Sequence, residues 1–212
     1  MVKTGIDKKH LAQLINKDDP IILDVGCNDG RESLEFLELF KAPQIFAFDP
    51  RPCVSSLFKE CENTYEGLEL IPLALTNRIG WSAWYPSDNH PASSSTKKPL
   101  DHLSVFPNFT FSERERVECT TLDHWAVSRS LEAIDLLWVD VNGAEADFLE
   151  GATTMLPKTR FIFIEFSAVE NQKLYENSLT RERILKKLTN FKELGVYDFM
   201  GNYGNLLLQN KK

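Results

Sequence analysis

Residues 21–30 read Ile-Ile-Leu-Asp-Val-Gly-Cys-Asn-Asp-Gly, in which an apolar run ends in a turn that contains two glycines. Beyond this turn, Ser33, Phe36, Leu37 and Phe40 recur at the spacing of one helix face. The stretch therefore predicts a buried strand, a tight turn and an amphipathic helix in succession. A strand followed by a helix is the repeating unit of a parallel sheet.

The rest of the chain repeats this alternation. A short leading helix is expected from Asp7, and the last helix carries Ile184, Leu188 and Phe191 on one face and is expected to end at Gly195. The predicted strands are 21–25, 45–48, 68–75, 81–85, 117–122, 134–141 and 161–166, followed by a closing hairpin of 196–200 and 206–209. We predict an α/β fold with a doubly wound, mostly parallel seven-stranded sheet and a C-terminal antiparallel hairpin.

The regular pattern is lost between residues 77 and 116. Residues 86–99 mix Pro, Ser, Asn and Lys, which is a loop composition, although 81–85 reads as a strand. We expect one domain over residues 1–212, into which a mobile loop and hairpin segment is inserted at about 77–116.

The charge balance argues against nucleic acid as a partner. The chain has 24 Lys and Arg against 31 Asp and Glu, a formal net charge of −7, whereas affinity for nucleic acid depends on clustered cations. No apolar run approaches the ~20 residues that cross a bilayer, and no signal-peptide pattern follows the N-terminus. A cytoplasmic protein without a membrane partner is expected. The four cysteines lack Cys-x-x-Cys spacing, and no metal site is expected.

The turn at residues 26–30 is suited to contact with a ligand. Gly26 and Gly30 let the backbone approach a bound molecule, and the N–H groups of the turn offer hydrogen bonds. With Asn28 the pattern is Gly-x-Asn-x-Gly, which lacks the second glycine of the usual dinucleotide fingerprint and so disfavours a nicotinamide cofactor. A tight turn with purely local hydrogen bonds from Asn28 and Asp29 is the structural alternative.

Acidic residues follow other predicted strands at the same edge of the sheet. Asp49 is placed to accept hydrogen bonds from both hydroxyls of a ribose, although a solvated turn before Pro50 is the alternative. Asp140 interrupts a strongly apolar run, and a carboxylate there requires donors or a cationic or hydroxylated ligand, unless it only caps the next helix. Glu165 is a weaker candidate of the same kind.

Five blocks of the sequence carry a resemblance to a known family. They are 22–30, 46–52, 120–123, 137–151 and 161–165, and they include Asp24-Val25-Gly26, Thr121-Leu122-Asp123 and Asp140-Val141-Asn142-Gly143-Ala144-Glu145. As a set and in this order, they resemble the FkbM-like family of S-adenosylmethionine-dependent methyltransferases. The resemblance implies a class I methyltransferase-like Rossmann fold, which the closing hairpin suits. Cys27 and Asn142 depart from the family pattern, in which Ala and Glu are usual.

The resemblance also implies where S-adenosylmethionine would bind. Asp49 would hold the ribose, and Asp140 would face the amino or sulfonium end of the cofactor. The remaining cofactor residues are Gly26, Cys27, Asn28 and Gly30 around the methionine part, Pro50 beside the ribose, and Leu75 and Thr76 near the adenine. Acidic side chains around the site suit a cationic ligand.

Methyl transfer to a hydroxyl benefits from a general base. The candidates are Asp140, Glu165, His90 and His102, since a carboxylate or an imidazole can take up a proton near neutral pH. For the two histidines, an exposed position in the loop is the alternative. Asp140 and Glu165 together with Asn142 do not form a recognised metal-ligand spacing.

The inserted segment is expected to determine the acceptor. Its aromatic side chains could stack on a sugar or polyketide face, or could form a small satellite core under the loop. These residues are Trp81, Trp84, Tyr85, Phe106, Phe109 and Phe111. We predict an S-adenosylmethionine-dependent methyltransferase that methylates a hydroxyl of a small molecule or glycan. The alternatives are a non-catalytic adenosyl-ligand-binding or scaffolding protein and, less favoured, a nicotinamide-dependent oxidoreductase.

Overall fold

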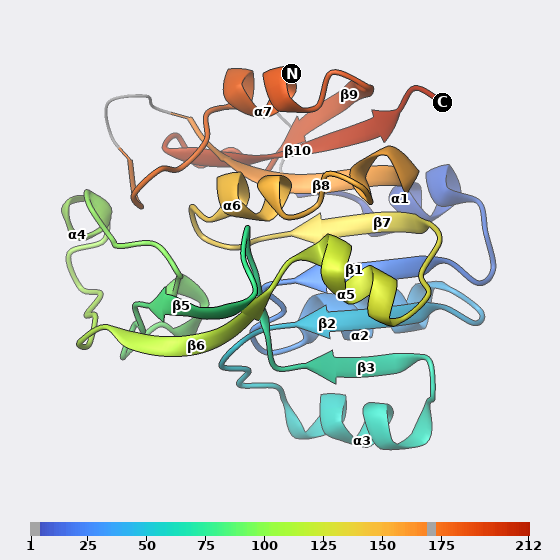
Figure 1. Ribbon diagram of the computed structural model, residues 1–212, viewed down its shortest axis with the longest axis horizontal. Coiled ribbons are helices and arrows are strands. Elements are labelled where there is room, and N and C mark those ends of the chain that lie inside the picture. Colours follow the sequence, from blue (N-terminus) through green and yellow to red (C-terminus); the bar gives the residue numbers. More distant parts are fainter. Residues whose placement is uncertain (1–4, 169–172) are drawn as a thin grey trace.

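The main sheet of the protein has seven strands, five of them parallel. The computed structural model describes residues 5–168 and 173–212. The strands are β1 (Ile21–Val25), β2 (Gln44–Phe48), β3 (Leu68–Ile71), β7 (Ile134–Val139), β8 (Thr159–Ser167), β9 (Phe191–Tyr197) and β10 (Tyr203–Asn210). Their order is β3-β2-β1-β7-β8-β10-β9, and β10 runs antiparallel to both β8 and β9 (Figure 1). The predicted doubly wound sheet with a C-terminal hairpin is confirmed.

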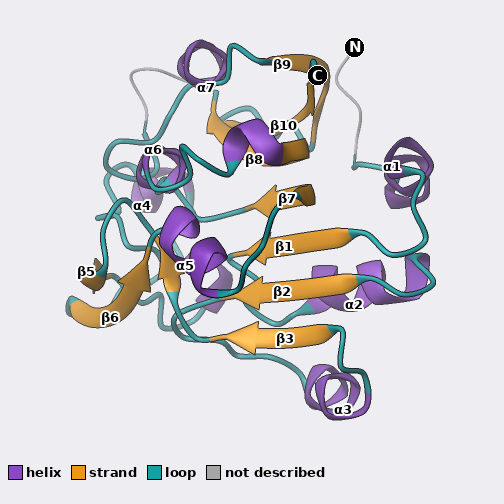
Figure 2. Ribbon diagram, turned by 45° about the vertical axis from the view of Figure 1, so that its right-hand side comes forward, coloured by secondary structure: helices purple, strands orange, loops and turns teal. Residues whose placement is uncertain are grey.

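Helices cover both faces of this sheet (Figure 2). One face carries α1 (Lys8–Ile15), α2 (Arg31–Leu39) and α3 (Ser56–Thr64), and the other carries α5 (Leu122–Ser128), α6 (Glu145–Glu150) and α7 (Arg181–Lys187). Alternation along β1 explains the two cores, because Ile22 packs with Phe36 and Phe58 on the first face and Leu23 packs with Phe148 on the second. Among the described residues, no helix is both long and apolar enough to span a bilayer.

Side-chain caps fix where several helices begin. The side chains of Asp7, Ser55, Thr121 and Thr180 each accept a hydrogen bond from a backbone N–H in the first turn of the helix that follows. These caps satisfy donors that have no partner within the helix. The leading helix expected from Asp7 is therefore confirmed.

A second, three-stranded sheet lies beyond the carboxyl ends of the parallel strands. Its strands are β4 (Ala74–Leu75), β5 (Gly80–Trp84) and β6 (Glu115–Thr120), in the order β4-β6-β5. Between β5 and β6 the chain forms the short 3-10 helix Pro91–Ser93 and α4 (His102–Val105). Figure 1 shows β5, β6 and α4 together at the left of the molecule, where the arrows of β1, β2, β3 and β7 end.

Two predicted boundaries are wrong. The strand expected over 68–75 ends at Ile71, because Pro72 has no N–H for the ladder and Leu73 N donates back to Ile71 O at 2.8 Å. The next two residues join the second sheet instead. The last helix ends at Lys187 and not at Gly195, since residues from Phe191 onward pair with β10 in an antiparallel ladder.

Candidate active site

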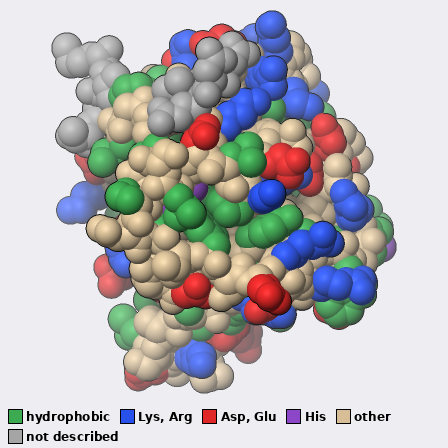
Figure 3. All heavy atoms as spheres, turned by 90° about the vertical axis from the view of Figure 1, so that its left-hand side faces the viewer, with side chains coloured by type: hydrophobic (Ala, Val, Ile, Leu, Met, Phe, Trp, Pro, Cys, Tyr) green, Lys and Arg blue, Asp and Glu red, His purple; other side chains and the backbone are tan. Residues whose placement is uncertain are grey.

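A cavity of about 510 Å³ opens at the carboxyl ends of the parallel strands. Its volume lies within the range of small-molecule sites, and its place at the edge of a doubly wound sheet is where such folds bind ligands. Figure 3 views this side of the molecule, where hydrophobic side chains lie near the centre with acidic and basic ones around them. The sequence-predicted residues that line the cavity are Gly26, Cys27, Asn28, Asp49, Pro50, Leu75 and Asp140.

Gly26 lies where the ends of three strands meet. Its φ is +90°, and a Cβ atom at this position would lie 1.8 Å from the carbonyl oxygen of Asp140. The N–H groups of Gly26 and Cys27 both donate to Phe48 O, at 2.8 and 3.0 Å. The turn is thereby held against β2 and the end of β7, which leaves its other side open to the cavity. Gly30, with φ +78°, packs against the ring of Phe58 instead of lining the cavity.

Asp49 follows β2 with half of its hydrogen-bonding capacity used. One carboxylate oxygen accepts from Arg51 N at 2.8 Å and the other from Asn28 N at 3.2 Å. Burial raises the pKa of Asp49, and the two backbone hydrogen bonds oppose this rise. Since a carboxylate has about four acceptor sites, two remain for a ligand with neighbouring hydroxyls.

The adenine side of the predicted site is apolar. Leu75 lines the cavity together with Phe48 and Leu73. Thr76 is buried and does not line it, because its N–H donates to Thr120 O at 2.8 Å and its hydroxyl to Arg78 O at 3.1 Å. Thr76 therefore holds β4 in position behind the cavity wall.

Asp140 and Glu165 are brought together by the pairing of β7 with β8. Val139 and Ile164 are partners in the parallel ladder, so the residues that follow them lie side by side. The two carboxyl groups hydrogen-bond to each other, and Asp140 is exposed to the cavity while Glu165 is only partly exposed behind it. Desolvation raises the pKa of Asp140 to about 6, the charge of Glu32 adds to this rise, and the hydrogen bond from Glu165 opposes it. Burial and the charges of Asp140 and Glu145 raise the pKa of Glu165 well above its usual value.

Two further carboxyl groups near the cavity were not among the predicted site residues. Asp24, in β1, is buried and accepts a hydrogen bond from Ser33 Oγ at 2.6 Å. Burial raises its pKa to about 7. Glu145, at the start of α6, is buried and accepts from Gly143 N at 3.0 Å, and burial raises its pKa to about 7. The sequence signal for Asp24 was a carboxylate within an apolar stretch, the same signal that singled out Asp140.

The two candidate histidines do not line the cavity. His90 Nδ1 lies 3.0 Å from Ser93 Oγ, and its ring stacks on Phe109. His102 is buried in an aromatic cluster and burial lowers its pKa. The rings around His102 are Phe106, Phe109, Phe111 and Tyr175. Phe106, Phe109 and Phe111 thus match the alternative of a satellite core, while the exposed position given as the alternative for the histidines holds for His90 and not for His102.

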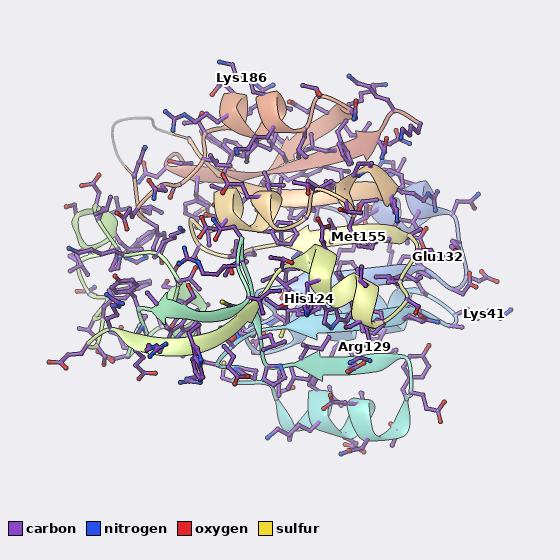
Figure 4. All side chains as sticks on the ribbon, in the orientation of Figure 1. Lys41, His124, Arg129, Glu132, Met155 and Lys186 are labelled. Atoms are coloured by element: carbon purple, nitrogen blue, oxygen red, sulfur yellow. The ribbon has the colours of Figure 1, made fainter. Side chains whose placement is uncertain are left out.

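Three other ionisable side chains, His124, Lys41 and Glu132, are not among the residues that line the cavity. His124 is exposed on α5, and Lys41 and Glu132 lie at the end of the main sheet opposite β5 and β6 (Figure 4). Within residues 5–168 and 173–212, no group of three or more His, Cys, Asp or Glu side chains is arranged to hold a metal ion.

The cavity is predominantly acidic. Among its described lining residues, the basic side chains are Arg31, which pairs with Asp29 at 2.8 Å, and Arg51, which pairs with Glu115 at 3.4 Å. The acidic lining residues are Asp24, Asp29, Glu32, Asp49, Glu115 and Asp140. The arrangement favours neutral or cationic ligands over anionic ones.

Comparison with known proteins identifies the family of the chain. The methyltransferase FkbM domain matches residues 24–199. The 2-O-methyltransferase NoeI of Sinorhizobium fredii (strain NBRC 101917 / NGR234) is 36% identical over 210 residues, which cover 96% of this chain and 85% of NoeI.

Two solved structures share the fold. The 1,6-didemethyltoxoflavin-N1-methyltransferase of Burkholderia thailandensis, with bound 1,6-didemethyltoxoflavin and S-adenosylhomocysteine, aligns over 96% of this chain and 76% of its own, with a TM-score of 0.51 and 10% identity. An rRNA methylase of Streptococcus thermophilus aligns over 97% and 95%, with a TM-score of 0.52 and 13% identity. The domain match and the identity to NoeI establish that the chain belongs to the family of methyltransferases with the FkbM domain.

Proposed function

We propose that the protein transfers a methyl group from S-adenosylmethionine to a hydroxyl of a neutral small molecule or glycan. The observation that carries the proposal is the convergence of the Gly26 turn, Asp49 and Asp140 on one cavity of about 510 Å³. The residues present fit the cofactor in three respects. The turn at Gly26 lines the cavity, Asp49 has unused acceptor sites, and the acidic lining suits a sulfonium cation.

Each part of the cofactor has residues suited to it. Asp49, beside Pro50, would accept from the ribose hydroxyls, and Leu75 with Phe48 would contact the adenine. The methionine part would lie along the turn that contains Gly26, Cys27 and Asn28, which Gly30 N closes by donating to Cys27 O. Thr76 would hold β4 in place behind the adenine side. When bound, S-adenosylmethionine supplies a methyl group on a good leaving group, so the chain has mainly to align the acceptor and exclude water.

Asp140 is the best placed general base. It is the member of the Asp140–Glu165 pair that is open to the cavity. The hydrogen bond between the two carboxyl groups raises the pKa of Glu165 and lowers that of Asp140, so Glu165 holds the shared proton and donates it to Asp140, whose pKa is about 6. Asp140 can then accept the proton of an acceptor hydroxyl. Glu165 acts through Asp140, and His90 and His102 have no direct part in this assignment.

The acceptor class follows from charge and from similarity. Both arginines that line the cavity among its described residues are paired, so a phosphate or carboxylate on the acceptor would meet unbalanced negative charge. The name of the relative NoeI assigns it methylation of an oxygen numbered 2. Both points support a hydroxyl on a neutral acceptor.

Calorimetric titration with S-adenosylmethionine, S-adenosylhomocysteine and NAD tests the cofactor assignment directly. We expect saturable binding of the first two ligands alone, and binding of NAD alone would contradict the proposal. A panel of methyl glycosides and small oligosaccharides, incubated with labelled S-adenosylmethionine, then tests the reaction. Binding without transfer to any hydroxylated acceptor would favour a non-catalytic adenosyl-ligand-binding protein.

A further inference from the structure

One wall of the cavity comes from the segment inserted between β5 and β6. Four residues of 91–96 line the cavity, namely Pro91, Ala92, Ser94 and Thr96. We call residues 91–96 the acceptor wall, because the cofactor residues assigned above occupy the strand ends and leave this side for the acceptor. The name rests on the proposed function, whereas the contacts that hold the wall do not.

Asn142 ties the acceptor wall to the loop between β7 and α6. Its side-chain amide donates to Ala92 O at 2.8 Å and to Ser94 O at 3.2 Å. The backbone carbonyl oxygen of Asn142 accepts a hydrogen bond from Ser95 Oγ at 2.7 Å. The φ of Asn142 is +50°, a conformation that Asn adopts more readily than most residues. Three hydrogen bonds therefore join one residue to the whole length of the wall.

Two further contacts hold the wall from the same side. Tyr175 is buried and its hydroxyl donates to Ser93 O at 2.6 Å. Tyr175 also packs on Gly143, where an added Cβ would lie 2.4 Å from the tyrosine Cβ. Directly after the wall, Lys97 pairs with Asp147 at 2.7 Å, and both side chains are largely buried. The wall is thus bound to the loop that carries Asp140.

We propose that Asn142 is a positioning residue that fixes the acceptor wall relative to Asp140. The two residues are separated by Val141 alone, so one short turn sets the position of the assigned base and of the surface that faces the acceptor. Alignment of reacting groups provides much of the rate enhancement of a displacement reaction. A displaced wall would weaken binding of the acceptor, while the cofactor residues at the strand ends would stay in place.

The proposal depends on Asn142 being a donor. An aspartate of nearly the same size has no N–H groups and would turn a carboxylate toward two carbonyl oxygens. Asn142→Asp therefore removes two hydrogen bonds and adds repulsion with little change in volume. Tyr175→Phe removes the hydrogen bond to Ser93 O in the same conservative way.

Asn210→Asp is a matched control. The side-chain amide of Asn210 also donates to two backbone carbonyls, Thr159 O at 2.8 Å and Pro157 O at 3.3 Å. These contacts lie where β8 begins, at the opposite end of the sheet from the cavity. The control therefore makes the same chemical change without touching the acceptor wall.

Hydrogen exchange measured by mass spectrometry tests, without any ligand, whether Asn142 and Tyr175 hold the acceptor wall in place. We expect the backbone amides of residues 92–97 to exchange about tenfold faster or more in Asn142→Asp, and less so in Tyr175→Phe, because hydrogen bonds that hold the segment are lost. Asn210→Asp should exchange there as the wild type does. Equal exchange in Asn142→Asp and the wild type would overturn the inference.

A kinetic comparison separates positioning from general stability. With the first methyl glycoside that the wild type methylates, Asn142→Asp should raise KM for the glycoside about tenfold, while affinity for S-adenosylhomocysteine changes less than about twofold. If Asn142→Asp lost as much affinity for S-adenosylhomocysteine as it loses for the glycoside, a role confined to the acceptor would be overturned. Failure of the wild type to bind S-adenosylhomocysteine would instead overturn the proposed function. The exchange comparison would still decide whether Asn142 holds the acceptor wall in place.

Discussion

Asp140, which directly follows β7, and Glu165, in the neighbouring strand β8, have their carboxyl groups hydrogen-bonded to each other. Two carboxylates this close cannot both ionise without strong repulsion, so the pair retains a proton over a wide pH range. Because Asp140 is open to the cavity and Glu165 lies behind it, the inner residue serves as donor and the outer one as acceptor.

Asp140→Asn should abolish the general base while keeping the shape of the site. We expect kcat to fall about 100-fold or more, the usual contribution of a general base, with S-adenosylhomocysteine still bound. Initial rates of methyl transfer and a calorimetric titration of the same preparation provide the two measurements. Unchanged kcat would refute the role of Asp140.

The pH dependence of activity should reflect the ionisation of the Asp140–Glu165 pair. Since Asp140 must be ionised to accept a proton, activity should decline as the pH falls through about 6. The hydrogen bond from Glu165 lowers the pKa of Asp140, so Glu165→Ala should move this decline to higher pH. Glu165→Gln keeps a donor and should leave the decline near its original position. Identical profiles for all three proteins would show that Glu165 does not act on Asp140.

Asp49→Ala should weaken binding of the cofactor. Loss of two hydrogen bonds from ribose hydroxyls to a charged acceptor predicts an increase of about 100-fold or more in the Kd for S-adenosylhomocysteine. Asp49→Asn keeps the shape and one acceptor oxygen, so an intermediate Kd is expected. Calorimetry gives both values, and thermal unfolding measures how much stability each variant loses with the hydrogen bonds from Asn28 N and Arg51 N weakened or removed. Affinity equal to the wild type would refute the ribose assignment.

Much of the fold could be predicted because its signals are local. The glycines of the first turn and the apolar runs of β1, β2, β7 and β8 read correctly in the sequence. The errors arose where pairing decides the structure. Phe191 continues the apolar pattern of α7 but becomes the first residue of β9, because β10 provides an antiparallel partner from the far end of the chain.

The site residues also fall into two groups, those that local sequence signals predict and those whose roles depend on contacts distant in the sequence. Asp49 and Asp140 were found because they end apolar strands, and the parallel sheet brings such ends together. The roles of His90, His102 and Asn142 depend on how the inserted segment folds back. Nothing near His102 in the sequence shows that Tyr175 closes its aromatic cluster. Likewise, the partners of Asn142 lie about fifty residues earlier in the chain.

Gly26→Ala should be far more destabilising than Gly201→Ala. The two glycines have nearly equal φ values, +90° and +88°, so the backbone strain of a side chain is matched. An added Cβ would lie 1.8 Å from Asp140 O at Gly26, whereas no atom lies within 4 Å at Gly201. We expect a loss of about 1 kcal/mol at Gly201 and about 3 kcal/mol or more at Gly26 in urea denaturation. Similar losses would mean that the loop after β7 relaxes away from the turn.

The buried carboxyl group of Asp24 should make stability depend on pH. Its pKa is raised by burial from 3.8 to about 7, so between these values the folded state holds a proton that the unfolded state has released. The penalty for burying Asp24 is therefore absent at low pH and grows as the pH rises toward 7. Asp24→Asn removes this penalty. The stability of the variant relative to the wild type should therefore increase by about 1–3 kcal/mol between pH 5 and pH 8.

Asp135→Asn is a control in which the change in stability relative to the wild type should have the opposite sign. Although burial opposes the effect, hydrogen bonds from Ile21 N, Arg160 and Lys17 hold the pKa of Asp135 below its usual value. Its ionised form stabilises the fold, and this stabilisation is lost only as the pH falls through the acidic range. Asp135→Asn should therefore be less stable than the wild type at both pH 5 and pH 8. Urea denaturation at the two pH values measures both variants, and a pH-independent difference for Asp24→Asn would show that Asp24 is ionised in the folded protein throughout.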